Sequence, residues 1–152
     1  MYKRQVSNFD VADLQELASP ACATNQVLYN IEERGIEFDL LPWWQQHHLP
    51  LMAYCPIAQG GELLSSPTLK QIAHRHEATP AQIALAWVLR QEGVIAIPKA
   101  VSPEHVRLNA SAAKLVLDEH DLDAIDRVFG APKRKHPLSM VCLLYTSPSP
   151  RD

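Results

Sequence analysis

The residues best suited to chemistry lie at 94–109, where the chain reads VIAIPKAVSPEHVRLN. The apolar run predicts a buried strand, and Lys99 follows at its end. Ser102 and Pro103 then predict the start of a helix, since serine is a favoured cap and proline a favoured first residue. A lysine beside the free N–H groups of a helix N-terminus can bind an anion such as phosphate. The pattern indicates a phosphate-bearing cofactor at the carboxyl end of a strand.

Alternating strands and helices would be needed to position such a site, and the sequence predicts them. Because the third predicted strand is apolar on both faces, we expect buried parallel strands. Short apolar runs predict strands at residues 6–8, 25–29, 51–54 and 94–98. Helical periodicity and helix-start signals predict helices that begin near Asp10, span 39–48, run from Ser66 to His76 and from Thr79 to Gln91, and begin at Ser102 and Asp118.

Several helices carry more specific signals. Thr79 and Gln82 have the spacing of a capping box, and Ser66 before Pro67 predicts another helix cap. The first helix should place Val11, Leu14, Leu17 and Ala18 on one face, and the last should bury Leu122, Ile125, Val128 and Phe129. The three tryptophans lie on helical segments, where we expect them to pack against the sheet: Trp43, Trp44 and Trp87.

The composition is that of an ordinary globular chain of 152 residues, with 47% hydrophobic and 20% charged residues. A formal net charge of -3 gives no support for nucleic-acid binding. No apolar run is long enough to span a bilayer, and the start lacks a signal-peptide pattern. An odd set of cysteines without framework spacing, namely Cys22, Cys55 and Cys142, predicts reduced thiols. We therefore predict a cytoplasmic protein that binds neither nucleic acid nor membrane.

Both ends differ in character from the middle of the sequence. Residues 1–5 and the Ser- and Pro-rich residues 141–152 resemble translated adapter sequence from a transposon-based sequencing library. We therefore expect these two ends to be non-native, the second of them disordered, and residues 6–140 to form a partial domain. The alternative is a natural start and a natural disordered tail.

Four parallel strands with helices between them fit either an open doubly wound sheet or part of a barrel. The dinucleotide fingerprint of an open sheet is absent after the first strand, but spacing alone does not decide. Four segments, in their order and spacing, resemble the aldo-keto reductases: VSNFDVADLQEL, NQVLYNIEE, LMAYCPIAQGG and IPKAVSPEHVRLN. The resemblance implies an α/β fold, the truncated C-terminal half of a (β/α)8 TIM barrel with about four parallel strands and outer helices. It also implies NADPH as cofactor, with NADH as an alternative.

The resemblance implies roles for residues at three strand ends. Ser7, Asn8 and Gln26 match residues that hydrogen-bond the nicotinamide carboxamide. Tyr54 matches the aromatic residue on which the nicotinamide ring stacks. Taken without the family, the first two could simply cap the following helix, and the tyrosine could be a core residue. The following loop, where relatives wrap the pyrophosphate, contributes Cys55, Pro56 and Ile57.

The fourth strand end matches the adenosine side of the cofactor site. Lys99 matches the lysine that meets the 2′-phosphate, and Asn109 matches a residue that contacts adenine. Ala100 stands where serine is common, and His105 where arginine is common. A neutral histidine lacks the permanent charge of arginine, so the expected NADPH preference depends mainly on the lysine. Ser102, the helix cap, belongs to the same predicted group; ordinary solvated surface charge is the alternative for the lysine.

Catalysis and metal binding have no candidate residues here. The family's general-acid tyrosine, with its Asp, Lys and His partners, belongs to the first half of the barrel, and none of those motifs occurs in this sequence. The pairs His47/His48 and His74/His76 lack the i, i+4 spacing of a helical zinc site and are predicted to be surface residues.

We therefore predict a fragment of an oxidoreductase that reduces small aldehydes or ketones to alcohols, inactive on its own and monomeric when intact. The alternative is a non-catalytic, nucleotide-binding half-barrel or an inactive fragment. An upstream reading frame would separate the two, because the alternative needs a natural start near Val6.

Overall fold

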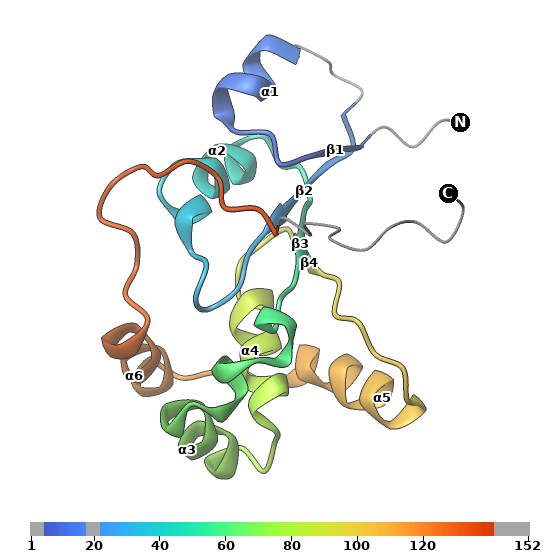
Figure 1. Ribbon diagram of the computed structural model, residues 1–152, viewed down its shortest axis with the longest axis vertical. Coiled ribbons are helices and arrows are strands. Elements are labelled where there is room, and N and C mark those ends of the chain that lie inside the picture. Colours follow the sequence, from blue (N-terminus) through green and yellow to red (C-terminus); the bar gives the residue numbers. More distant parts are fainter. Residues whose placement is uncertain (1–4, 18–21, 142–152) are drawn as a thin grey trace, which may run out of the picture.

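Four strands form one parallel sheet in the computed structural model, which describes residues 5–17 and 22–141 (Figure 1). The strands lie in sequence order, and each pairs with the next in parallel. Ala18, Cys142 and most of the two expected non-native ends lie outside the described residues. The strands are β1 (Gln5–Ser7), β2 (Thr24–Leu28), β3 (Leu51–Tyr54) and β4 (Val94–Ala96).

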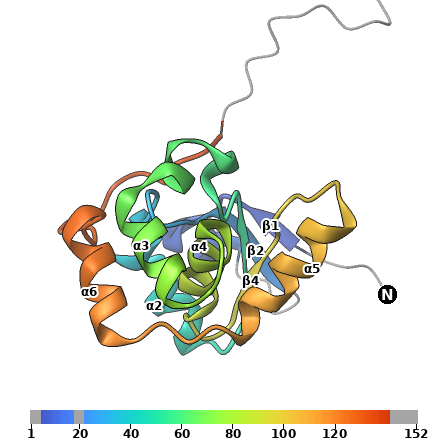
Figure 2. The same cartoon turned by 90° about the horizontal axis from the view of Figure 1, so that it is seen from below.

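Helices follow every strand, as predicted, and Figure 2 shows most of them to one side of the strands, with the helix that follows the fourth strand beside that strand. The α-helices are α1 (Val11–Leu17), α2 (Leu40–Gln46), α3 (Pro67–Arg75), α4 (Pro80–Leu89), α5 (Pro103–Ser111) and α6 (Glu119–Val128). Short 3-10 turns join them: η1 (Gly35–Glu37), η2 (Ala58–Gly60), η3 (Glu62–Ser65) and η4 (Ala112–Lys114).

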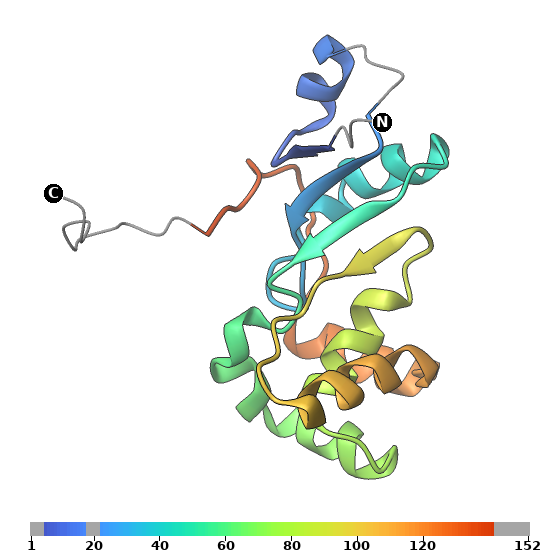
Figure 3. The same ribbon diagram turned by 90° about the vertical axis from the view of Figure 1, so that its right-hand side faces the viewer.

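Figure 3 shows the strands of the sheet running in the same direction, in agreement with their parallel pairing. The two faces of the sheet differ sharply in burial. Leu51 and Ala53 point to the helix side and are fully buried. Met52 and its register partner Ile95 point to the opposite, inner face of the sheet, where Ile95 is 45% exposed. Helices thus cover only the outer face, which is the arrangement expected for part of a barrel. The outer-face core includes Val27, Leu51, Ala53, Val94, Trp44, Ile83 and Trp87.

Several predicted boundaries and contacts are corrected by the structure. The fourth strand ends at Ala96 rather than residue 98, because its last register pair is with Ala53 and β3 itself ends one residue later. The fourth helix ends at Leu89, two residues before the predicted Gln91. On α6, Ile125 is buried but Val128 is 56% exposed, because the packed stripe leans toward the side that carries Leu122.

His76 is not the plain surface residue that the sequence predicts. Its Nε2 lies 2.7 Å from a carboxylate oxygen of Asp121, which is fully buried at the start of α6. Arg75 donates to the other oxygen of the same carboxylate. The last helix is thereby tied to α3 by two basic residues that are distant from it in sequence.

The helix caps predicted from the sequence are only partly present. Thr79 and Gln82 form the predicted capping box: the threonine hydroxyl accepts from the glutamine N–H and the glutamine side chain bonds the threonine N–H. Ser66 occupies the predicted cap position, but its side chain makes no capping bond. Trp44 and Trp87 are buried as predicted, and Trp43 is partly buried.

We expect Thr79→Ala to lower the free energy of unfolding by about 1 kcal/mol, because the Gln82 N–H loses its partner at a helix start. Ser66→Ala is the matched control and should change stability by no more than a few tenths of a kcal/mol, since no capping bond is lost. Urea unfolding of both variants, at one protein concentration, measures the difference. Equal losses in the two variants would contradict the role given to the box.

Candidate functional site

A polar cluster lies where β1 and β3 end, beside Gln26 in the middle of β2. The Tyr54 hydroxyl donates to Oδ1 of Asn8 at 3.2 Å, joining the ends of β3 and β1. The Ser7 hydroxyl donates to the main-chain oxygen of Gln26 at 3.0 Å, and the Asn8 N–H donates to the same oxygen at 2.9 Å. The structure therefore brings together all four residues that the sequence assigns to the nicotinamide end.

The structure does not support the alternative roles of these residues, a helix cap for Ser7 and Asn8 and a core position for Tyr54. Asp10, rather than Ser7 or Asn8, caps α1: its carboxylate accepts from the Asp13 N–H at 3.0 Å, and Asp13 returns the contact. That N–H bond and nearby Lys135 outweigh the opposing effect of partial burial and hold the pKa of Asp10 below its usual value. Asn8 has a φ of 56°, a left-handed conformation that asparagine tolerates better than most residues. Tyr54 is only partly buried, so its ring is not a core residue.

The loop after β3 forms one wall of a cavity of about 630 Å³. Cys55 turns the chain sharply there with a φ of 49°. Lys99 closes the opposite side, so the ring of Tyr54, the loop main chain and a cation share one space. The lining residues are Tyr54, Cys55, Pro56, Ile57, Gln59, Ile97 and Lys99.

A smaller cavity of about 230 Å³ adjoins the first, and Lys99 and Ile57 line both. It holds His105 and Asn109, so the structure also brings together three predicted adenosine-side residues. Ser102 caps α5, since its hydroxyl accepts from the His105 N–H at 3.1 Å. The full lining is Ile57, Leu64, Thr79, Ala81, Lys99, His105, Leu108 and Asn109.

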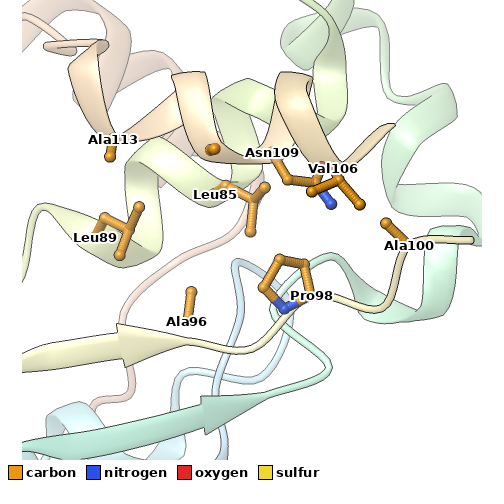
Figure 4. Close-up of a pocket in the computed structure, with 9 residues that line it drawn as sticks. Leu85, Leu89, Ala96, Pro98, Ala100, Val106, Asn109 and Ala113 are labelled. Atoms are coloured by element: carbon orange, nitrogen blue, oxygen red, sulfur yellow. The ribbon is translucent and has the colours of Figure 1, made fainter. Parts of the chain in front are cut away.

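Ala100 does not line that smaller cavity, and of the group only Asn109 lies on the same cavity as Ala100. Ala100 lines a third, mostly apolar cavity of about 380 Å³ beneath α5 (Figure 4). Leu85, Leu89 and Val106 surround it there, together with Pro98. Lys99 and Ala100, although adjacent in the sequence, therefore line different cavities.

Two contacts that the sequence did not predict hold the site in place. The buried side chain of Asn30 donates to the Cys55 carbonyl at 3.0 Å and accepts from the N–H groups of Glu32 and Glu33. It thereby joins the loops after β2 and β3. Gln82 donates to the Ser111 hydroxyl at 2.8 Å and ties α4 to the end of α5. An asparagine directly after a strand was the only sequence signal for the first of these.

The chemistry of the donor set fits a dinucleotide better than a catalytic acid. Amide and hydroxyl groups can bind a carboxamide, an aromatic ring can stack on a planar base, and a lysine can pair with phosphate. Tyr29 is fully buried beside Trp87 in the core rather than at the site. Burial and the neighbouring Glu37 carboxylate raise the pKa of Tyr29 far above its ordinary value, so its hydroxyl remains protonated.

None of the helices among residues 5–17 and 22–141 has the length and apolar character needed to cross a membrane. Residues 3–129 match the family model described as "Aldo/keto reductase family". The chain is 48% identical over 144 residues to methylglyoxal reductase YeaE of Escherichia coli K12, covering 90% of this chain and 51% of that protein. It is 36% identical over 124 residues to glyoxal reductase of Bacillus subtilis, covering 80% and 44%.

Solved structures agree with the sequence comparison. A crystal structure of an aldo-keto reductase from Klebsiella pneumoniae in complex with NADPH superposes with a TM-score of 0.86 at 49% identity. That match covers 90% of this chain and 51% of the other. The chain thus spans about half the length of the relatives it matches, and these neighbours are (β/α)8 barrels. Four parallel strands with helices on one face confirm the predicted half-barrel.

Proposed function

Because the chain belongs to the aldo/keto reductase family, we propose that residues 6–140 form the cofactor-binding half of an enzyme that reduces small aldehydes or ketones to alcohols with NADPH. The observation that supports this most is the contact between Tyr54 and Asn8, which joins a stacking ring to an amide at the strand ends. Beside it, the cavity between the Cys55 loop and Lys99 leads away from that ring toward α5.

Each part of the site has a binding role in this proposal. The bound cofactor supplies the hydride. Asn8, Ser7 and Gln26 orient its carboxamide by hydrogen bonds, while the Tyr54 ring packs on the nicotinamide and leaves one ring face to the substrate. The main chain of the Cys55, Pro56 and Ile57 loop lies along the pyrophosphate. These groups position a reactant, which is how a binding half contributes to rate.

The adenosine end determines which cofactor is preferred. Lys99 pairs with the 2′-phosphate, and His105 and Asn109 line the same cavity. Ser102 keeps the start of α5 in register with that cavity through its cap. Because histidine carries charge only when protonated, NADH remains the alternative cofactor.

The proton that completes the reduction comes from the part of the enzyme that this chain does not span. In the proposal that part holds the general-acid tyrosine and its partners, and residues 1–5 and 141–152 are not native to the enzyme. The names of the relatives, methylglyoxal reductase and glyoxal reductase, support small dicarbonyl compounds as substrates. We further propose a cytoplasmic enzyme that is monomeric when intact.

A chimera tests this function. Residues 6–140 are joined to the part of Escherichia coli methylglyoxal reductase YeaE that the match leaves uncovered. We expect turnover of methylglyoxal with NADPH, and we expect Tyr54→Ala to weaken NADPH binding about tenfold or more through loss of the stacking surface. The control is Tyr29→Phe, which changes a core tyrosine away from the site. A folded chimera without turnover would refute the proposal.

A second prediction concerns cofactor choice in the same chimera. His105→Arg should tighten NADPH by about threefold to tenfold and leave NADH nearly unchanged, because arginine adds a permanent charge beside Lys99. The low end applies because His105 is exposed. Dissociation constants for the two cofactors measure the effect. Equal changes for both would show that the side chain does not face the 2′-phosphate.

A further inference from the structure

The sheet has two open edges, and we propose that two copies of this chain close on each other into one barrel. In the described residues, β4 pairs only with β3 and β1 only with β2. A two-fold axis along the strands places β4 of each copy beside β1 of the other and keeps all strands parallel. Four strands from each copy make eight, the number whose side chains just fill a barrel. This inference is independent of the proposed activity.

The backbone at both edges is free to form such a ladder. The Ile97 N–H donates to the Ala53 carbonyl at 3.1 Å, so by alternation the intervening Ala96 turns its N–H to the open side of β4. The Asn8 N–H donates to β2, so Gln5 and Ser7 turn theirs to the open side of β1. Unpaired parallel edges of this kind are templates for another strand.

Helix α5 overhangs the open edge of β4 without a strand beneath it. None of its nine residues is buried, and Val106 is 53% exposed. The apolar cavity of about 380 Å³ in Figure 4 lies between this helix and β4, with Ala96 and Pro98 on the strand side. Val6 of a second copy fits here: it lies on β1 in register with the buried, helix-facing residues of the sheet.

The inner face of the sheet also needs a cover. Ile95 and Ile97 are 45% and 39% exposed there, whereas their outward-facing neighbour Val94 is buried. In the closed pair these side chains would face the same residues of the second copy across the barrel interior. Removal of their apolar area from water is the main driving force for the assembly.

The segments that would meet at the new edge differ in charge: α1 is acidic, whereas α5 with the turn after it has one more basic than acidic residue. The exposed acidic residues of α1 are Asp13 and Glu16, and this helix has no basic residue. Arg107 on α5 and Lys114 just after it are exposed and basic, with Glu104 the one acidic residue of α5. Closure places α1 of one copy beside α5 of the other, so the pairing is electrostatically favourable.

Sedimentation and light scattering of the purified full chain test the proposal. We expect one species of twice the 17.0 kDa chain mass. Ile95→Lys should convert it to a folded monomer, because the side chain is exposed in one copy and enclosed in the pair. Val116→Lys is the control: that valine is 83% exposed between α5 and α6, and the variant should stay dimeric. A wild-type monomer or a polydisperse aggregate would overturn the proposal.

Edge variants separate this barrel from a symmetric edge-to-edge dimer. Gln5→Pro blocks only the β1 edge and Ala96→Pro only the β4 edge, since each removes an N–H that points to the open side. Each variant alone should be monomeric, whereas their mixture should form a heterodimer through the one remaining intact edge pair. If either variant alone stays dimeric while circular dichroism shows it folded, the β4-to-β1 pairing is wrong.

Discussion

The 152-residue chain, assayed alone with NADPH and methylglyoxal, will show no reductase turnover above background. The physical reason is that the proposed site positions a cofactor but holds no proton donor for the carbonyl oxygen. General acid catalysis by a positioned side chain contributes about 10²–10⁴-fold. Loss of the other barrel half also removes the substrate's surroundings, so the expected deficit against the chimera is at least about 10⁴-fold.

The chimera described above is the positive control, because it contains residues 6–140 of the same chain. Turnover is measured for the chain alone and for the chimera. A spectroscopic assay of NADPH oxidation with matched protein concentrations suffices. A mixture of the chimera and the inactive chain should show the turnover of the added chimera and no more. Turnover by the chain alone within tenfold of the chimera would contradict the proposal that this chain binds the cofactor while the other half of the barrel supplies the proton donor.

Asp121→Asn should lower the free energy of unfolding at pH 7 by about 2–3 kcal/mol, the second large effect that we expect. This carboxylate is fully buried and holds Arg75 and His76 of α3 against α6. The variant leaves two basic side chains without their anion. Asp118→Asn is the matched control, because asparagine caps a helix about as well as aspartate and Asp118 is exposed.

The same residue gives the stability a defined pH dependence. Burial raises the pKa of Asp121, but His76, the Asp118 N–H and Arg75 outweigh it and bring that pKa below the usual value. A carboxylate whose pKa is lowered on folding stabilises the fold at pH values above its pKa in the unfolded chain, about 3.9. This stabilisation is lost as the pH falls through the pKa of the folded state. Urea unfolding should therefore show the wild type losing its advantage over Asp121→Asn below about pH 4. An advantage that persists well into that range would show that the carboxylate charge is not the cause.

Local signals predicted much of this fold because they depend on neighbours in sequence. Thr79 and Gln82 lie three positions apart, and the cap that they predict is present. The third strand, whose apolar run is bounded by Pro50 and Pro56, has the predicted limits. The grouping of Ser7, Asn8 and Tyr54 at strand ends also follows from parallel strands, since their carboxyl ends meet at one edge. Gln26 lies in the middle of β2 rather than at its predicted end, and it joins the group because it is in register with Ser7.

Other features depended on contacts that no local pattern contains. Arg34 is buried and reaches Asp126 at 2.7 Å across 92 positions, while His76 reaches Asp121 across 45. Nothing in the spacing of these residues sets them apart from ordinary surface charges. A charged side chain is buried only where a distant partner compensates its desolvation, and such partners are brought together by packing.

The sequence by itself determined the alternation of strands and helices, the caps at Thr79 and Ser102, and the residues that follow each strand. Only the tertiary structure decided how the residues at 99–109 divide among cavities: Lys99 and His105 line one, Ala100 lines another, and Asn109 lines both. It also decided that Ile95 and Ile97 lie exposed on an uncovered face while Val94 is buried. The physical reason is that burial depends on which surfaces meet, and an apolar residue in a strand is equally suited to either face until the helices cover one of them.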